Sequence, residues 1–334
     1  MPEKDSRLQK IHYWLENELN MEAGTIEPAS NDASFRRYFR IFLQQKTHII
    51  MDAPPQLENL RPFLHVAELM DKSGINVPDI FRRNLEHGFL ILEDFGRCCY
   101  LDKLDAENVT PLYQAAMKVL LKLQQNTNIA TSGLPHYDYD LLNKELELFR
   151  EWFLQQLLNA DLSAADHIIL DQTWKILIKS ALEQPKVCVH RDFHSRNLMY
   201  LEENNPGIID FQDAVIGPIT YDLVSLLKDC YISWPEKQVN RWVNEYHQRL
   251  FQSGLIDCET KQFKRWFDLM GIQRHLKATG IFSRLQIRDG KPGYLKDIPR
   301  TMNYVTEACK QYPELTEFGH FLKKKILPID HFSK

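Results

Sequence analysis

The chain has 334 residues, with 41 lysines and arginines against 45 aspartates and glutamates, and 44% of its residues are hydrophobic. This length suits two domains or one large bilobal unit, and the composition excludes disordered and fibrous classes. The net charge of −4 gives no reason to expect a nucleic-acid partner, and no apolar run approaches the length that crosses a bilayer.

Hydrophobic periodicity predicts a β-rich region followed by a helical one. The first part shows a helix over 5–20, strands over 34–43 and 47–52, a helix over 58–72, and strands over 79–83 and 88–94. Beyond Gly96 the pattern predicts amphipathic helices, interrupted by one β-hairpin at 197–211; the helices cover 103–127, 139–159, 163–182, 236–253, 259–282 and 298–310. We therefore predict an α+β, two-lobed fold, in which residues 1–95 carry an antiparallel sheet, residues 96–334 are mostly helical, and a ligand cleft lies between.

The beginning of the chain and its cysteines indicate a cytoplasmic protein. The opening residues, MPEKDSRLQK, are charged and lack the apolar region of a signal peptide. The 6 cysteines form no Cys-x-x-Cys pair, and Cys98 is adjacent to Cys99, so we expect reduced thiols without a catalytic role.

The most informative stretch contains His190, Asp192 and Asn197 in the pattern H-x-D-x-x-x-x-N, with Asp210 at the end of the predicted hairpin. Phosphoryl transfer requires a carboxylate that orients the attacking hydroxyl and accepts its proton. It also requires amide and carboxylate oxygens that hold Mg²⁺ against the nucleotide phosphates. Asp192 fits the first role, and Asn197 and Asp210 fit the second, an arrangement that chance rarely produces around a hairpin.

These two motifs, His190–Asn197 and Asp210-Phe-Gln, resemble those of the protein-kinase-like superfamily, and within it the aminoglycoside phosphotransferase and choline kinase family. The resemblance extends over about residues 20–310. It implies a five-stranded sheet in a nucleotide-binding lobe (1–95), a helical catalytic and substrate-binding lobe (96–334), and ATP with Mg²⁺ as cofactors. A protein kinase is disfavoured, because Tyr221-Asp222-Leu follows soon after Asp210 and no Ala-Pro-Glu occurs.

The resemblance also implies supporting roles around the catalytic loop. His190 belongs to the loop itself, and Asp222 resembles the aspartate that braces it, with a helix N-cap as the alternative. Arg191 would act beside Asp192 by steadying the transferring phosphoryl group or a substrate carboxylate. Pairing of Arg191 with a structural carboxylate is the alternative.

The expected nucleotide site departs from the kinase pattern. No G-x-G-x-x-G occurs, and small polar residues would instead present backbone N–H groups to phosphate: Ser30, Asn31, Asp32, Ala33 and Ser34. Asp52 stands where the phosphate-binding lysine is expected, and its charge would repel phosphate. We hypothesise that Arg36, Arg37 or Arg40 replaces that lysine, the alternative being that they are solvated surface charges. The stretch 90–96 resembles the family's hinge, which implies main-chain contacts to adenine from Glu93, Asp94 and Phe95.

Several stretches resemble a subgroup of amino-sugar kinases within this family, at 32–40, 51–55, 190–199, 210–223 and 288–294. This resemblance implies phosphorylation of the anomeric C1 hydroxyl of N-acetylmuramate or N-acetylglucosamine, giving a sugar 1-phosphate in peptidoglycan recycling. It implies no nucleic-acid, membrane or obligate protein partner. The alternatives are a kinase of choline, an aminoglycoside or a hydroxylated amino acid, and a catalytically inactive nucleotide-binding scaffold.

The substrate pocket is predicted from aromatic and charged residues of the helical region. Aromatic residues make up 11% of the chain, more than a core usually requires, and sugar rings pack against such side chains. Residues 145, 149 and 152 share a helix face, with core packing as the alternative for the two aromatic ones. Basic residues on a late helix favour an anionic or neutral sugar over a cation. The predicted substrate contacts are Tyr137, Glu145, Trp152, Arg274 and His275.

Overall fold

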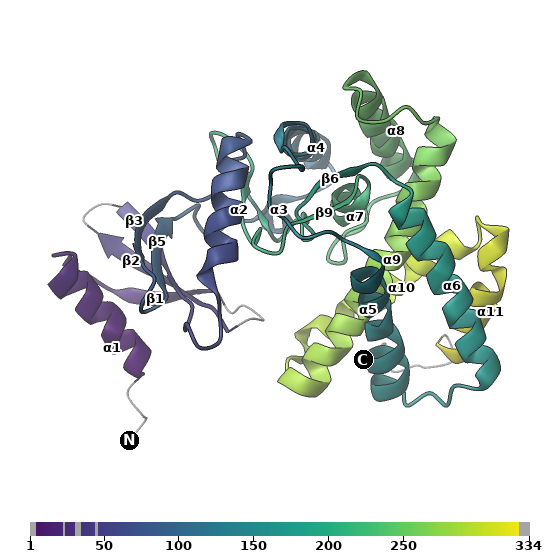
Figure 1. Cartoon of the computed structure of the whole chain (residues 1–334), viewed down its shortest axis with the longest axis horizontal. Helices are drawn as coiled ribbons and strands as arrows, with labels where there is room; N and C mark the ends of the chain where they lie inside the picture. Colours follow the sequence, from purple (N-terminus) through teal and green to yellow (C-terminus); the bar gives the residue numbers. More distant parts are fainter. Residues whose placement is uncertain (1–4, 23, 31–34, 44–45, 327–334) are drawn as a thin grey trace. The chain divides into compact units, whose positions relative to one another are not determined.

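The computed structural model describes residues 5–22, 24–30, 35–43 and 46–326, and the chain divides into two units (Figure 1). The first unit comprises residues 1–98 and 199–213, and the second comprises residues 99–198 and 214–334. The chain first passes from one unit to the other between residues 98 and 99, close to the predicted boundary at 95/96. Periodicity alone does not reveal that the tip of the catalytic hairpin belongs to the first unit.

An antiparallel sheet in the order β1-β2-β3-β5-β4 forms the centre of the first unit. Five strands were implied by the family resemblance, and this count is confirmed for the described residues. The strand that periodicity missed contains Pro28, which lacks a backbone donor and is tolerated here because the strand lies at the sheet edge. The strands are β1 (Ile26–Ser30), β2 (Arg37–Leu43), β3 (Lys46–Asp52), β4 (Ile80–Asn84) and β5 (Phe89–Glu93).

The opening helix packs against the sheet of its own unit. The predicted helix over 5–20 is observed as α1 (Ser6–Tyr13) and a π-helical segment η1 (Trp14–Glu18). Its apolar side chains join those of the sheet in one buried cluster: Ile11, Trp14, Leu15, Phe39, Ile41, Ile50, Phe89 and Ile91. Burial of this stripe, rather than intrinsic propensity, therefore stabilises the short helix.

A second helix of this unit, α2 (Leu60–Lys72), begins at Asn59, whose side chain accepts a hydrogen bond from the Arg61 N–H. Such an N-cap satisfies one of the unpaired donors at a helix start. Phe63 on α2 packs its ring 4.9 Å from that of Phe211, beside the predicted metal ligand Asp210. The segment that carries Asp210 is thus anchored in the core of the first unit.

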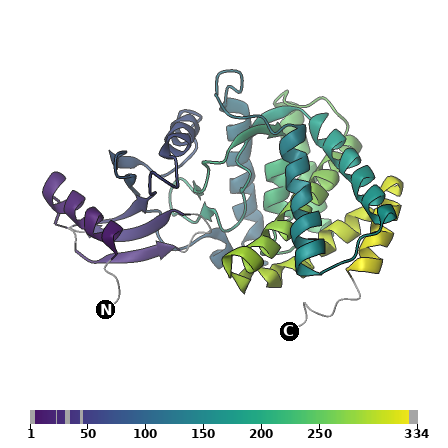
Figure 2. The same ribbon diagram turned by 60° about the horizontal axis from the view of Figure 1, so that its bottom comes forward.

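The second unit is mainly helical, and its helices pack around α9 (Thr260–Asp289), as Figures 1 and 2 show. Two short strand pairs complete the fold. In the second unit β6 (Lys186–Val189) pairs antiparallel with β9 (Val215–Pro218). The other pair joins β7 (Leu198–Met199) to β8 (Gly207–Ile208), and its residues from 199 onward belong to the first unit. The other helices are α3 (Tyr100–Lys103), α4 (Val109–Asn126), α5 (Tyr139–Leu148), η2 (Phe149–Leu157), α6 (Ala164–Leu182), α7 (Tyr221–Leu227), α8 (Glu236–Gln252), η3 (Pro292–Asp297), α10 (Ile298–Cys309), η4 (Pro313–Leu315) and α11 (Thr316–Lys325).

The predicted helix over 139–159 changes its winding midway. It is α-helical up to Leu148 and π-helical over η2, where hydrogen bonds run from i to i+5. The wider turn buries Phe149 and Phe153 and leaves Trp152 half-buried. The expectation that Glu145, Phe149 and Trp152 share one face was based on regular α-helical spacing, which the chain does not keep beyond Leu148.

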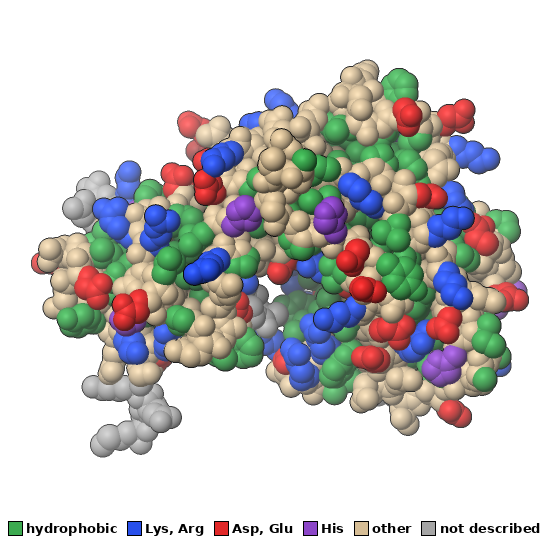
Figure 3. All heavy atoms as spheres, viewed as in Figure 1, with side chains coloured by type: hydrophobic (Ala, Val, Ile, Leu, Met, Phe, Trp, Pro, Cys, Tyr) green, Lys and Arg blue, Asp and Glu red, His purple; other side chains and the backbone are tan. Residues whose placement is uncertain are grey.

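The predicted fold class is confirmed, with an antiparallel sheet in the N-terminal region and mostly helices in the C-terminal region. All 6 cysteines lie in the described part of the chain, and no disulfide joins them. Within that part, every helix is too short or too polar to cross a bilayer. On the face drawn in Figure 3, basic and acidic side chains are interspersed and form no large field of one sign.

Candidate active site

The predicted catalytic loop leaves β6 at His190 and is held by a buried carboxylate. Asp222 in the first turn of α7 accepts hydrogen bonds from the backbone N–H of His190 at 2.7 Å and of Arg191 at 3.0 Å. Arg191 has a φ of 77°, a left-handed conformation that is strained for a residue with a long side chain. The two hydrogen bonds stabilise this turn and so fix the backbone immediately before Asp192.

Asp222 therefore makes the contacts that the bracing role requires. The N-cap of α7 is Thr220, so the alternative of an N-cap is excluded for Asp222. The Asp222 side chain is completely buried, and this burial raises its pKa to about 7, while the two N–H donors act in the opposite direction.

We expect Asp222→Asn to destabilise the protein by about 2 kcal/mol, because the amide nitrogen would face an N–H donor and leave it unsatisfied. The distorted loop should also lower kcat more than tenfold. Urea denaturation and initial-rate kinetics measure the two effects. Asp257→Asn, at an exposed position of the same unit, is the matched control and should change neither. Unchanged stability of Asp222→Asn would contradict the bracing role.

The two predicted metal ligands lie in different units and are described separately. In the second unit, the Asn197 Nδ2 donates to the Asp192 carbonyl oxygen at 3.1 Å, which identifies the other end of the amide as the oxygen. In the first unit, Asp210 has a φ of 63°, and its Oδ1 accepts a hydrogen bond from Gln212 at 2.8 Å. An amide oxygen and a carboxylate form the hard donor set that suits Mg²⁺.

Asp192 lies in a strongly positive environment. Burial would raise the pKa of its carboxyl, but the positive charges of Lys277 and Arg274 on α9, together with His194 and Arg191 of the loop, lower it to about 2. Asp192 is consequently ionised at neutral pH and available to accept a hydrogen bond from a hydroxyl group.

This electrostatic arrangement predicts an effect on the pH dependence of catalysis. Because a lowered pKa keeps the carboxyl ionised well below neutrality, Asp192 should not contribute to a loss of kcat/KM between pH 8 and pH 5. Lys277→Met removes the cation that lowers this pKa most, so the acidic limb of its profile should move to higher pH, by about one unit, which single-turnover rates after brief exposure to pH values between about 2 and 5 would measure. The profile of Lys261→Met, an exposed residue of the same helix, should match the wild type. Coinciding profiles for Lys277→Met and the wild type would contradict the assignment.

A buried network joins two of the predicted substrate residues to the loop. Glu145 contacts the Arg191 guanidinium and the Tyr137 hydroxyl, and its Oε1 lies 3.1 Å from the Lys277 Nζ. The Lys277 Nζ also donates to the Tyr221 hydroxyl at 3.0 Å. Burial opposes ionisation of Glu145, but Lys277 and Arg191 hold its pKa below the usual value. The pairing of Arg191 with a structural carboxylate is thus present in this structure.

Most of the predicted substrate residues are inaccessible as the structure stands. Tyr137 is 1% exposed and packs edge-on against Tyr221, so it presents no ring surface to a sugar. His275 is completely buried, donates from its Nε2–H to the Lys228 carbonyl at 2.8 Å, and stacks on Tyr304; burial lowers its pKa to about 3. Arg274 is also buried, and it acts on Asp192 through its charge. Of the five predicted substrate residues, only Trp152 is not fully buried.

Most of the predicted phosphate loop lies outside the described residues, namely Asn31, Asp32, Ala33 and Ser34. Ser30 ends β1. The three arginines proposed to replace the missing lysine all contact carboxylates: Arg36 with Glu58, Arg37 with Asp5 and Asp52, and Arg40 with Asp94. The role of a phosphate clamp therefore remains a prediction, and it would require one of these pairs to open.

Arg40 and Asp94, a residue of the predicted hinge, form the pair whose two side chains are both most fully buried. The guanidinium of Arg40 binds both carboxylate oxygens of Asp94, at 2.5 and 2.8 Å, and the Gly96 carbonyl at 2.9 Å. Burial would raise the pKa of Asp94, but this pairing holds it below its ordinary value. The side chains are committed to one another, so adenine contacts from Glu93, Asp94 and Phe95 are expected from the main chain only.

Asp52 has a structural role in the first unit. Its side chain is 0% exposed and accepts hydrogen bonds from the Arg7 Nε at 2.9 Å and from the Arg37 Nε at 3.0 Å. Arg37 lies directly opposite Asp52 on the neighbouring strand, whereas Arg7 comes from α1. The position expected to hold a phosphate-binding lysine thus fastens the opening helix to the sheet.

Sequence reasoning missed further residues that shape the loop. Asp229, only 1% exposed, accepts hydrogen bonds from the Ser195 Oγ at 2.5 Å and the Ser195 N–H at 2.9 Å, so it acts as a second brace. Arg196 stacks over Tyr231, with its Cζ 3.8 Å from the ring centroid. No local pattern marks these pairs, because each partner lies far along the chain. Lys277 could have been found from its position three residues after Arg274.

Comparison with known proteins was made against family models, curated sequences and solved structures. Residues 25–259 match the model described as the phosphotransferase enzyme family. A protein of Pseudomonas putida named N-acetylmuramate/N-acetylglucosamine kinase is 44% identical over 96% of this chain and 97% of its own length. One of the same name from Neisseria meningitidis is 39% identical over 92% of both.

Solved structures show the same fold at low sequence identity. A choline kinase from Streptococcus pneumoniae superposes with a TM-score of 0.65 at 13% identity, over 92% of this chain and 100% of its own. A spectinomycin phosphotransferase in complex with ADP and spectinomycin gives 0.61 at 15% identity, over 98% and 100%. The family match covers most of the chain and includes the loop of Asp192 and the segment of Asp210. The chain belongs to the phosphotransferase enzyme family.

Proposed function

We propose that the protein transfers the γ-phosphoryl group of ATP to the anomeric C1 hydroxyl of N-acetylmuramate or N-acetylglucosamine. Support comes from relatives of that name at 44% identity across nearly the whole chain. The structural observation that carries the proposal is the ionised Asp192 among Lys277, Arg274 and Arg191. These cations disfavour a cationic acceptor such as choline, whereas a neutral sugar or a sugar with a lactyl carboxylate is compatible with them.

In the proposed reaction, the Asp192 carboxylate accepts a hydrogen bond from the C1 hydroxyl and aligns its oxygen with the γ-phosphorus. A bond forms between that oxygen and phosphorus, the bond from phosphorus to the β–γ bridging oxygen breaks, and ADP leaves. The hydroxyl proton passes to Asp192 and then to solvent. Positioning supplies most of the rate enhancement, because phosphoryl transfer needs little base strength.

We propose Asn197 and Asp210 as the residues that would hold Mg²⁺, since both offer oxygen donors. The ion would neutralise charge on the nucleotide phosphates during transfer. Asp222 and Asp229 keep the catalytic loop in shape throughout. A cytoplasmic location is proposed as well, because ATP is the donor and no disulfide joins the cysteines.

The proposal is tested by incubating the protein with ATP, Mg²⁺ and a panel of acceptors, followed by phosphorus NMR. The expected result is an anomeric phosphate doublet with N-acetylmuramate or N-acetylglucosamine. The panel includes choline, an aminoglycoside and a hydroxylated amino acid as alternatives. Phosphorylation of one of these acceptors alone would overturn the sugar assignment. Hydrolysis of ATP without any phosphorylated acceptor would overturn both the sugar assignment and the assignment as a small-molecule kinase.

A further inference from the structure

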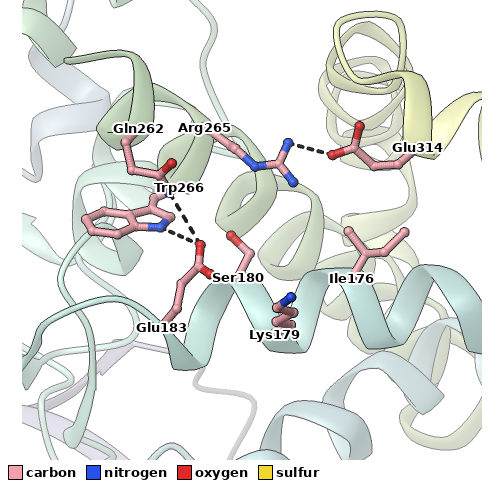
Figure 4. A pocket seen from close by; sticks show the side chains of 8 residues that line it. All are labelled: Ile176, Lys179, Ser180, Glu183, Gln262, Arg265, Trp266 and Glu314. Atoms are coloured by element: carbon pink, nitrogen blue, oxygen red, sulfur yellow. Dashed lines mark hydrogen bonds and ion pairs between the residues drawn. The ribbon is translucent and has the colours of Figure 1, made fainter. Parts of the chain in front are cut away.

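A pocket of about 600 Å³ lies within the second unit, between α6, α9 and η4 (Figure 4). None of the residues assigned to catalysis lines it. Its walls are formed by Ile176, Lys179, Ser180, Glu183, Gln262, Arg265, Trp266 and Glu314. We call it the α6–α9 pocket. The volume falls in the range of small-molecule sites and is too large for a single ion.

The two carboxylates of the α6–α9 pocket already have partners. Glu183 accepts hydrogen bonds from the Trp266 Nε1 at 2.7 Å and from Gln262 at 3.4 Å. Glu314 pairs with the Arg265 Nη1 at 2.6 Å. These contacts, drawn as dashed lines in Figure 4, fix the walls on both sides of the pocket.

The donors that remain point to an anionic ligand. The Ser180 Oγ is buried in a residue that is 4% exposed, and it has no hydrogen-bond partner among the described residues. It projects from α6 toward the space beside Arg265 and Trp266 (Figure 4). The neighbouring Lys179 is exposed and forms no ion pair within the described part of the chain. A buried hydroxyl without a hydrogen-bond partner destabilises the protein unless a ligand binds it. Two cationic side chains, Lys179 and Arg265, line the same pocket as this hydroxyl.

The charge balance of the walls selects among anions. Lys179 and Arg265 offset Glu183 and Glu314, so the pocket as a whole is close to neutral. A dianion such as phosphate would be repelled by the two carboxylates, whereas a single carboxylate is matched by Lys179 and the Ser180 hydroxyl. The polar groups of Gln262 and Glu183 suit hydroxyl groups on the body of the same molecule.

We propose that the α6–α9 pocket is a second ligand site, which binds a small hydroxylated monocarboxylate. Ser180 and Lys179 would bind the carboxylate, with Arg265 adding long-range attraction, and the polar wall would bind hydroxyl groups. The proposal does not depend on which acceptor the enzyme phosphorylates, because the pocket contains no residue of the catalytic loop.

The test uses the full chain saturated with a non-hydrolysable ATP analogue and Mg²⁺, titrated with gluconate and, separately, with inorganic phosphate. The readout is the indole N–H resonance of Trp266, identified by its absence in Trp266→Phe. We expect a saturable shift with gluconate and weaker binding of phosphate. A shift that does not saturate would overturn the site, and tighter binding of phosphate would overturn the carboxylate assignment.

Variants separate binding from structure. Ser180→Ala and Lys179→Gln should each weaken gluconate binding tenfold or more, while Lys175→Gln, an exposed residue one turn away on α6, should leave it unchanged. Thermal unfolding of Ser180→Ala is measured in parallel. Because this change removes an unpartnered hydroxyl, the free protein should be at least as stable as the wild type. Unaltered gluconate affinity in both variants would contradict the proposal.

Discussion

Asp192→Asn should lower kcat by about a thousandfold or more, while nucleotide affinity stays within about twofold of the wild type. The substitution keeps the shape of the side chain but removes the acceptor that aligns the attacking hydroxyl and takes its proton. The carboxylate is ionised in the wild-type protein because Lys277 and Arg274 lower its pKa to about 2. Initial rates with ATP and the sugar give kcat, and calorimetric titration with a non-hydrolysable analogue gives the affinity.

Asp140→Asn provides the matched control, since Asp140 is exposed in the first turn of α5. It should have wild-type rates. If Asp192→Asn retained more than about a tenth of the wild-type kcat, another group would have to act as the base.

Asp52→Lys should destabilise the protein by about 4 kcal/mol and bring no gain in ATP affinity. The change restores the residue type typical of kinases at this position, but it places an ammonium group against Arg7 and Arg37 in a site that is 0% exposed. The guanidinium groups of Arg7 and Arg37, both partly exposed, would lose this buried counter-ion, and α1 would lose its polar connection to β3. Urea denaturation gives the free energy of unfolding, and the KM for ATP shows whether ATP affinity has increased.

Asp71→Lys makes the same change of charge at an exposed position of α2 and should cost less than about 0.5 kcal/mol. Asp52→Asn removes the charge without reversing it, so its loss in free energy of unfolding should lie between those of Asp71→Lys and Asp52→Lys. A lower KM for ATP in Asp52→Lys with unchanged stability would show that this position serves the nucleotide after all.

Much of the fold could be predicted from periodicity, because long amphipathic helices and alternating strands leave a clear pattern. The helix over 163–182 is observed as Ala164–Leu182, with a capping box at Ser163 and Asp166. α9 runs beyond the predicted end at 282, up to Gly290, whose φ of 63° ends the helix. The π-helical turn of η2 and the strands β6 and β9 could not be predicted, since tertiary packing rather than local sequence determines them.

The candidate site could be predicted as far as its motif residues. Asp192, Asn197 and Asp210 follow from spacing and chemistry, and the contact of Asp222 with the loop agrees with its proposed role. The substrate residues were predicted from residue type, which cannot distinguish a pocket wall from a buried network. Tyr137, for example, binds Glu145 in the interior because Arg191 and Lys277, distant in sequence, supply the charge that makes this burial tolerable.

The assignment of residues 199–213 to the first unit has a consequence for dividing the protein. The Ile208 N–H donates to the Asn76 carbonyl at 2.8 Å, and the Asn204 carbonyl accepts a hydrogen bond from the Asn76 side chain. Gly207 lies so close to the Phe95 ring that a Cβ there would approach within 2.6 Å. A fragment that ends at residue 98 would therefore lack part of its own interior. A split version of the protein should reassemble only if the N-terminal piece is supplied together with the piece that carries this hairpin. For the same reason, the N-terminal region expressed alone should be unstable.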